Sequence, residues 1–143
     1  MRNGLGLWLA LVAFALGAAV PAQAQGGSTP LAGTSWVLVE LNGQPLAPGG
    51  EPLTLHFAAD EQSVSGYGGC NQFSGPYAQS GASLRFGPLA STRRACADPA
   101  LSNQETAYFQ ALESTTRYAV EGGRLVLYSG NQVVARFRRG GQA

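Results

Sequence analysis

Lysine is absent from this 143-residue chain, and histidine and cysteine are scarce, with one His and two Cys. Without lysine the chain cannot form a Schiff base with a carbonyl substrate, nor build the lysine-bearing phosphate loop of nucleotide-binding proteins. Nine arginines against eight acids give a formal net charge of +1, whereas nucleic-acid binding requires a clear surplus of positive charge. We therefore expect no nucleic-acid partner.

The same scarcity argues against a metal or a cofactor. Structural zinc takes four Cys or His ligands and catalytic zinc takes three protein ligands, but Cys70, Cys96 and His56 show no ligand spacing. The glycine pattern that begins at Gly66 lacks the third glycine of the dinucleotide fingerprint, and no helix follows it. We expect no cofactor and no bound metal.

The beginning of the chain has the layout of a secretory signal peptide. A short positive start is followed by an apolar run from about Leu5 to Val20 and by the triplet Ala22-Gln23-Ala24, which predicts cleavage after Ala24. The alternative is a membrane anchor, but the run is shorter than the roughly 20 apolar residues of a spanning helix. No cysteine near the cut offers a lipoprotein attachment site. We expect a periplasmic or secreted protein without a membrane span: residues 1–24 are removed, 25–30 form a flexible lead-in, and 31–139 form one domain.

Most of the predicted domain alternates apolar and polar residues with the two-residue period of β-strands. Turn sequences such as Glu-Gly-Gly and Ser-Gly-Asn separate these segments. The segments span residues 34–41, 52–58, 63–69, 75–79, 83–89, 116–122, 123–129 and 131–139. This pattern predicts a mainly β fold in which an antiparallel meander forms a partly open half-barrel.

One segment has the period of an α-helix, over about residues 100–114. Tyr108 and Leu112 fall on one apolar stripe of that helix. Ser102 and Glu105 have the spacing of a capping box, while Asp98-Pro99 offers an earlier start with proline at the first helical position. The fold therefore contains a single helix, inserted late in the chain.

Alternation also predicts the direction of individual side chains. In the first strand Trp36, Leu38 and Glu40 share one face. In the last strand Arg136 and Arg138 share one face, where they could bind a carboxylate or a phosphate in fork geometry. The alternative is a solvated edge strand protected by its charge.

The stretch "SGYGGCNQFSGPY" (residues 65–77) places Cys70 among four glycines. A catalytic thiol needs a nearby base, normally histidine, but alternation points His56 outward, away from the core residues Leu55 and Phe57. Two cysteines in an exported chain usually pair, and closing a loop of this size stabilises a fold by roughly 3–4 kcal/mol in the chain-entropy model. We expect a Cys70–Cys96 disulfide and no catalytic residue. A small thiol-dependent enzyme or redox protein using both cysteines is the alternative.

Five stretches together resemble the META domain family, which includes the bacterial heat-shock protein HslJ, over about residues 31–139. They are "LAGTSWVLVELNG", "VSGYGGCNQFSGPY", "LRFGPLASTRRAC", "QETAYFQAL" and "YAVEGGRLVLYSGNQVVARF". The positions that match the family pattern are Gly69, Cys70, Asn71, Phe73, Gly75, Tyr77, Thr92, Arg93 and Cys96. The resemblance implies a half-open antiparallel barrel with one helix, in a bacterial envelope protein associated with stress or antibiotic tolerance. It supplies no catalytic residues, so these positions are expected to be structural.

One position departs from the family pattern: Arg94 stands where an apolar residue, often methionine, is common. Either the charge occupies a packing position or this edge faces water in the present chain.

These observations predict a monomeric, non-enzymatic envelope domain that acts as a binding or structural module. Its partner would be an envelope protein or a small apolar ligand held at the open side of the barrel. Trp36, Phe57, Tyr108 and Phe109 would line such a site, with core packing as the alternative for each. A third possibility is a domain that buffers envelope stress without a dedicated ligand.

Overall fold

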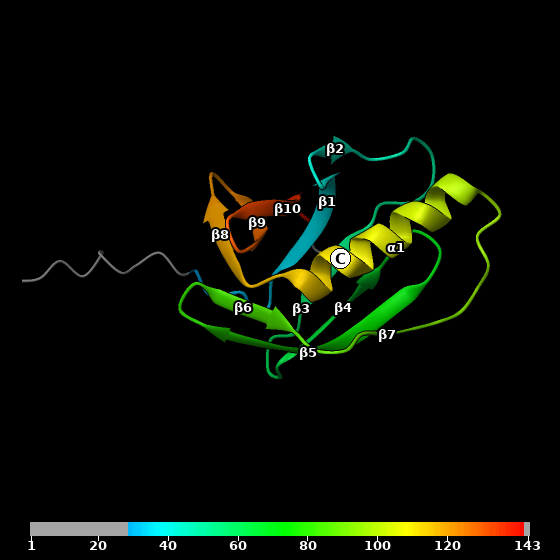
Figure 1. Ribbon diagram of the computed structural model, residues 1–143. Coiled ribbons are helices and arrows are strands. Elements are labelled where there is room, and N and C mark those ends of the chain that lie inside the picture. Colours follow the sequence, from blue (N-terminus) through cyan, green and yellow to red (C-terminus); the bar gives the residue numbers. More distant parts are fainter. Residues whose placement is uncertain (1–28, 142–143) are drawn as a thin grey trace, which may run out of the picture.

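The structure is a computed structural model that describes residues 29–141 (Figure 1). The predicted signal peptide and residues 25–28 of the lead-in lie outside the described residues. In chain order the elements are β1 (Ser35–Leu41), β2 (Gln44–Pro45), β3 (Thr54–Phe57), β4 (Ser63–Tyr67), β5 (Gln72–Ser80), β6 (Ser83–Phe86), β7 (Ala90–Ser91), α1 (Pro99–Ser114), β8 (Arg117–Glu121), β9 (Arg124–Ser129) and β10 (Gln132–Arg139). The predicted mainly β fold with one late helix is confirmed.

The strands form one antiparallel, ring-like sheet. Neighbours follow the order β1, β3, β4, β5, β6, β8, β9 and β10, and β10 pairs with β1 again, so the pairing returns to its starting strand. The short strands β2 and β7 pair with β1 and β5 outside this circuit. The thinnest junction lies between β6 and β8, where Ser83 and Arg117 are the single residue pair. The predicted half-barrel is therefore least closed at this junction.

A β-bulge in β1 changes the predicted faces of that strand. The register against β10 shifts between Leu38 and Glu40, so one extra residue stands on β1 at this point. Trp36 and Leu38 are buried as expected, but beyond the bulge Leu41 is the buried residue and Glu40 is partly exposed. The prediction that Glu40 shares a face with Trp36 was wrong. It assumed strict alternation of side chains along the strand, and the extra residue of the bulge reverses the faces beyond Leu38.

The helix α1 lies against the inner side of the ring (yellow in Figure 1). The aromatic ring of Tyr108, on α1, packs edge-on against the ring of Phe73 of β5, with 5.8 Å between the ring centroids. It also packs against the ring of Phe137 of β10. Asp98 caps the helix by accepting from the backbone N–H of Ala100, and Pro99 occupies the first turn. The earlier of the two predicted helix starts is therefore correct. Within residues 29–141, no helix is both long and apolar enough to cross a bilayer.

Candidate functional site

The carboxylate of Glu105 holds the loop between β4 and β5 against the helix. Its Oε2 atom accepts hydrogen bonds from the backbone N–H groups of Cys70, at 2.9 Å, and Asn71, at 2.7 Å. Successive backbone N–H groups of this kind form a concave site for an anion, and here the anion is the protein's own side chain. Glu105 is 8% exposed, so its burial is compensated by hydrogen bonds to its charged form.

Asn71 connects this loop to the segment that carries the second cysteine. Its Nδ2 donates to Glu105 Oε1 at 2.7 Å and to the carbonyl of Arg94 at 3.2 Å. Its Oδ1 accepts from Thr92 Oγ1 at 2.9 Å and from the Arg94 backbone N–H at 2.6 Å. The amide therefore uses both its donors and both its acceptor positions, which explains why a buried polar side chain is tolerated here.

Glycine is required in this loop because the helix and the neighbouring strands approach closely. A Cβ on Gly68 would lie 2.8 Å from Glu105 Oε2 and 2.8 Å from the Phe109 ring. Gly69 has φ +119°, a conformation that side chains rarely adopt. Glycine here thus permits the close approach of α1 and of the neighbouring strands. Gly69 and Cys70 also line a groove of about 330 Å³ beside the disulfide.

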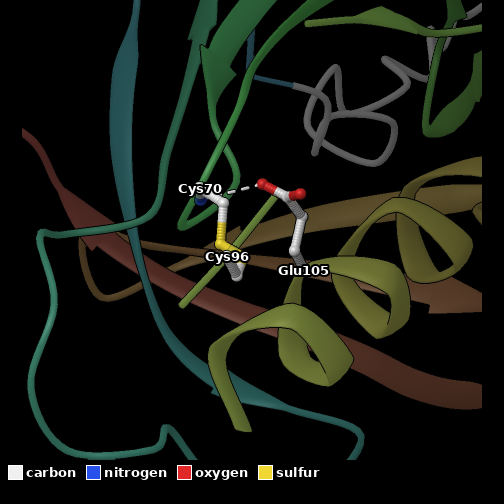
Figure 2. A group of neighbouring side chains, drawn as sticks. All are labelled: Cys70, Cys96 and Glu105. Atoms are coloured by element: carbon white, nitrogen blue, oxygen red, sulfur yellow. Dashed lines mark hydrogen bonds between the residues drawn. A yellow bond between two sulfur atoms is a disulfide. The ribbon is translucent and has the colours of Figure 1, made fainter. Parts of the chain in front are cut away.

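The predicted Cys70–Cys96 disulfide is present, with 5.6 Å between the two Cα atoms. Figure 2 shows it beside Glu105, whose carboxylate accepts from the Cys70 backbone. The two sulfurs and a Glu105 oxygen lie within 4.8 Å of one another, the distance range of a metal site. The sulfurs are bonded to each other and the carboxylate is bound to backbone N–H groups. Only after reduction of the disulfide could these three groups act as metal ligands.

The remaining family-pattern residues apart from Arg93 join the core or the same network. Phe73 and Tyr77 are buried, and the Tyr77 ring packs edge-on against Phe57. A Cβ on Gly75 would lie 2.6 Å from the carbonyl oxygen of Pro88, so glycine permits the close passage of that segment. Arg93 is exposed, and nothing in the structure explains its side chain.

Arg94 is exposed and contributes only its backbone to Asn71. Of the two explanations for this departure from the family pattern, the second holds: the edge faces water.

The role of Glu105 was not predicted from the sequence, where it was considered only for its capping-box spacing from Ser102. The informative signal was its place on the apolar stripe, four residues after Leu101 and three before Tyr108. An acid on a buried stripe requires a partner in the fold, and the partner is the loop around Cys70.

The aromatic residues expected to line a ligand site are mostly core residues. Trp36, Phe57 and Tyr108 are buried, and Phe109 packs against the core at its edge. The indole N–H of Trp36 donates to Thr34 Oγ1 at 2.8 Å, and the guanidinium of Arg139 lies over its ring. All four pack in or against the core, and Trp36 also borders a groove over β1 and β3.

The two arginines of the last strand have different environments. Arg136 pairs with Glu40 at 3.3 Å, so its charge is matched. Arg138 is exposed, and among the described residues no carboxylate lies within ion-pair distance of it. It stands opposite Arg124 of β9 in the sheet register, and directly opposed like charges are unfavourable. Arg138 is therefore the one of the pair that is free to meet an anion.

A groove of about 670 Å³ lies over the outer side of β1 and β3. Its lining includes Ser35, Val37, Pro52, Thr54, His56 and Gly140. His56 points outward as predicted, and its Nδ1 lies 2.8 Å from Ser35 Oγ. The structure thus places the only histidine of the chain beside a serine, away from the disulfide.

Comparison with known proteins assigns the fold to a family. A sequence model described as the META domain matches residues 29–141. A search of curated proteins found no match.

Three solved structures are similar. One, an NMR structure of a protein from Burkholderia xenovorans, shares 31% identity with a TM-score of 0.67, covering 91% of this chain and 94% of its own. A second NMR structure shares 27% identity with a TM-score of 0.61, and the match covers 76% of this chain and 90% of that protein. A crystal structure of a DUF4847 family protein from Bacteroides vulgatus shares 16% identity with a TM-score of 0.57, covering 79% and 96%, and indicates the fold alone.

Proposed function

The chain belongs to the META domain family, and from this premise we propose that it is a non-enzymatic binding or structural module of the bacterial envelope, related to stress or antibiotic tolerance. In this proposal the protein is exported, the disulfide forms outside the cytoplasm, and the rigid ring presents its outer surface to a ligand or partner. A disulfide between its two cysteines fits an oxidising compartment.

The observation that carries the proposal is that the two sulfurs and the buried polar side chains of the cysteine motif are all used in internal contacts. Cys70 and Cys96 are bonded to each other. Glu105 accepts from two backbone N–H groups and from Asn71, and Asn71 in turn holds Thr92 and Arg94. A catalytic centre needs a nucleophile, a base or a charged group that is free to meet a substrate. This network supports an architectural role because its members are already committed to one another.

The first experiment is the intact mass of the exported, purified protein after alkylation without reductant. A chain beginning at Gln25 with no alkyl group added is expected for a processed, disulfide-bonded domain. Two alkyl groups on the native protein would instead show accessible thiols and favour the thiol-dependent alternative.

The matched variants Cys70→Ser and Cys96→Ser test the architectural role directly. Each removes the same cross-link, so both should lower the free energy of unfolding by the same amount, about 3–4 kcal/mol in the chain-entropy model. Urea unfolding followed by circular dichroism measures this loss. A large loss for one variant and none for the other would mean that the cysteines act separately, as in a reactive thiol.

The envelope role has its own test in cells. A deletion strain is expected to grow less well than its parent under heat or antibiotic challenge, and re-expression of the protein should restore growth. A deletion strain indistinguishable from its parent in both challenges would remove the stress-related part of the proposal.

A further inference from the structure

We propose that the groove over β1 and β3 binds a small molecule that has an apolar body and a single carboxylate head. This inference rests on the proposed function and deepens it, because it names the ligand class of the binding module.

The size and walls of the groove suit the apolar part of such a ligand. Its volume of about 670 Å³ lies within the range of about 300–1,000 Å³ that is typical of small-molecule sites. Val37 and Pro52 supply apolar side chains, while Gly140 and Gly141 supply none. A chain of several methylene groups would therefore meet apolar surface along the outer side of the two strands.

The Ser35–His56 pair can donate one hydrogen bond to the carboxylate head of the ligand, whichever of the two side chains donates to the other. If Ser35 donates to His56 Nδ1, the neutral imidazole carries its proton on Nε2 and can donate from there. If Nδ1 donates to the serine, the hydroxyl proton of Ser35 is free to turn to the ligand. Both residues line the groove, so an acceptor group such as a carboxylate has a partner in both cases.

Arg138 lies next to the groove lining in the sheet, although its own side chain is not part of that lining. It pairs in register with Val37, a groove residue, and directly opposed side chains lie about 4.5–5.5 Å apart at Cβ. Its Nη1 reaches the carbonyl of Arg139 at 3.4 Å, just before the groove residue Gly140. The guanidinium thus has a contact one residue before the groove lining.

The charge balance favours a monoanion. Arg136 is neutralised by Glu40 and the guanidinium of Arg139 lies over the Trp36 ring. Arg138 is therefore the neighbouring guanidinium with neither partner, and one guanidinium matches one planar carboxylate with two parallel hydrogen bonds. The cross-strand neighbour Arg124 raises the local positive potential further along the sheet. An anion near Arg138 would also relieve the repulsion between these two arginines.

Octanoate and octanamide are suitable probes because they share an apolar chain and differ in the charge of the head. The exported, oxidised protein, labelled with ¹⁵N, is titrated with each compound below its aggregation range, and amide shifts are followed by NMR. Octanoate should shift the amides of Ser35, Val37 and His56 saturably and bind at least about fivefold more tightly than octanamide, a difference of about 1 kcal/mol. Acetate, which has the head without the chain, should shift none of them.

Two matched arginine variants locate the charge effect. Arg138→Gln should reduce the octanoate affinity at least about fivefold and change the octanamide affinity less than about twofold. Arg85→Gln, on an exposed position of β6, should change neither.

Equal affinity for the two compounds, equal effects of the two variants, or shifts spread over the whole protein would each overturn the ligand class. Failure of the proposed function is a separate outcome, read from alkylation and from the cysteine variants. A folded, disulfide-bonded protein that does not bind octanoate would contradict the proposed ligand class and leave the proposed function standing.

Discussion

At the scale of single residues, the distinctive feature is one buried amide matched to one buried carboxylate. Asn71 donates to Glu105 and accepts from Thr92 and Arg94, so each of its atoms has a defined role. A buried network of this kind is strongly stabilising only when all of its members are satisfied. Exchanging the donor and acceptor roles within the pair therefore provides a sharp test.

Asn71→Asp places a second carboxylate against Glu105 and should lower the free energy of unfolding by about 3–5 kcal/mol, the range for an uncompensated buried charge. Adding Glu105→Gln should restore more than half of this loss. The new glutamine oxygen can accept from the backbone N–H groups of residues 70 and 71, while its NH₂ group donates to the carboxylate introduced at position 71. Urea unfolding of the single and double variants gives the coupling energy.

Glu113→Gln is the control for this pair, because Glu113 is an exposed acid on the same helix. Combined with Asn71→Asp it should restore nothing. Equal rescue by both glutamines would mean that net charge, and not the contact with Asn71, determines the effect.

A second prediction at this scale concerns Gly66 of β4. A Cβ there would overlap the carbonyl oxygen of Thr54 and lie 2.7 Å from the Phe73 ring. Gly66→Ala should destabilise the fold by about 1–3 kcal/mol, as expected for overpacking. Gly141→Ala, where no atom lies within 4 Å of the added carbon, should change stability by less than about 0.5 kcal/mol. Chemical denaturation of both variants decides whether close approach is the reason for glycine.

At the scale of elements, alternation and helical period located the strands and the helix, since both patterns arise from burial of one face. The predicted helix over 100–114 agrees with α1, Pro99–Ser114. What local patterns could not supply were the bulges, which depend on pairing with a distant strand. In β10 a second register shift leaves Val134 and Ala135 both buried, against the predicted alternation.

The candidate site was predictable only in part, for a related reason. The disulfide was predicted from the number of cysteines and the expected compartment. The tight bend of the chain around Cys70 was indicated by its glycines. The Glu105 contact and the Ser35–His56 pair join residues that lie 34 and 21 positions apart. Such partners become visible only when the sheet register is known.

The ring should open first at its thinnest junction. There, β6 and β8 share two backbone hydrogen bonds outside their single residue pair, from Leu84 to Thr116 and from Tyr118 to Ala82. Local opening has a low free-energy cost where few hydrogen bonds must break together. The amide protons of Leu84 and Tyr118 should therefore exchange faster than those in the middle of β9 and β10, as measured by hydrogen exchange with NMR detection. Slower exchange at these two amides would show that another junction opens first.

At the scale of the whole molecule, a buried tyrosine couples stability to alkaline pH. Burial raises the pKa of Tyr108 well above its usual value, and its hydroxyl donates to the Thr54 carbonyl at 2.8 Å. Burial likewise raises the pKa of Tyr118. Because the unfolded chain releases these protons near pH 10 and the folded chain retains them, stability is complete below about pH 10 and falls above it.

Tyr108→Phe should remove one such contribution. At neutral pH the variant should be less stable by about 1–3 kcal/mol, because the Thr54 carbonyl loses its donor. Above pH 10 its stability should fall less steeply than that of the wild type, by about 1.4 kcal/mol per pH unit, so the two curves converge. Denaturation midpoints measured across this range test the convergence; parallel curves would contradict it.

The pairing of β1 with β10 also has a consequence for biosynthesis. Trp36 of β1 and Arg139 of β10 are partners in register. One edge of β1 therefore stays unpaired until β10 has been synthesised. Until Gln132–Arg139 has emerged, both β1 and β9 present an unpaired edge, and exposed edges of this kind favour wrong pairing. The ring therefore cannot close before β10 has been made, and the pairing of its first and last strands is the last part of the sheet that can form.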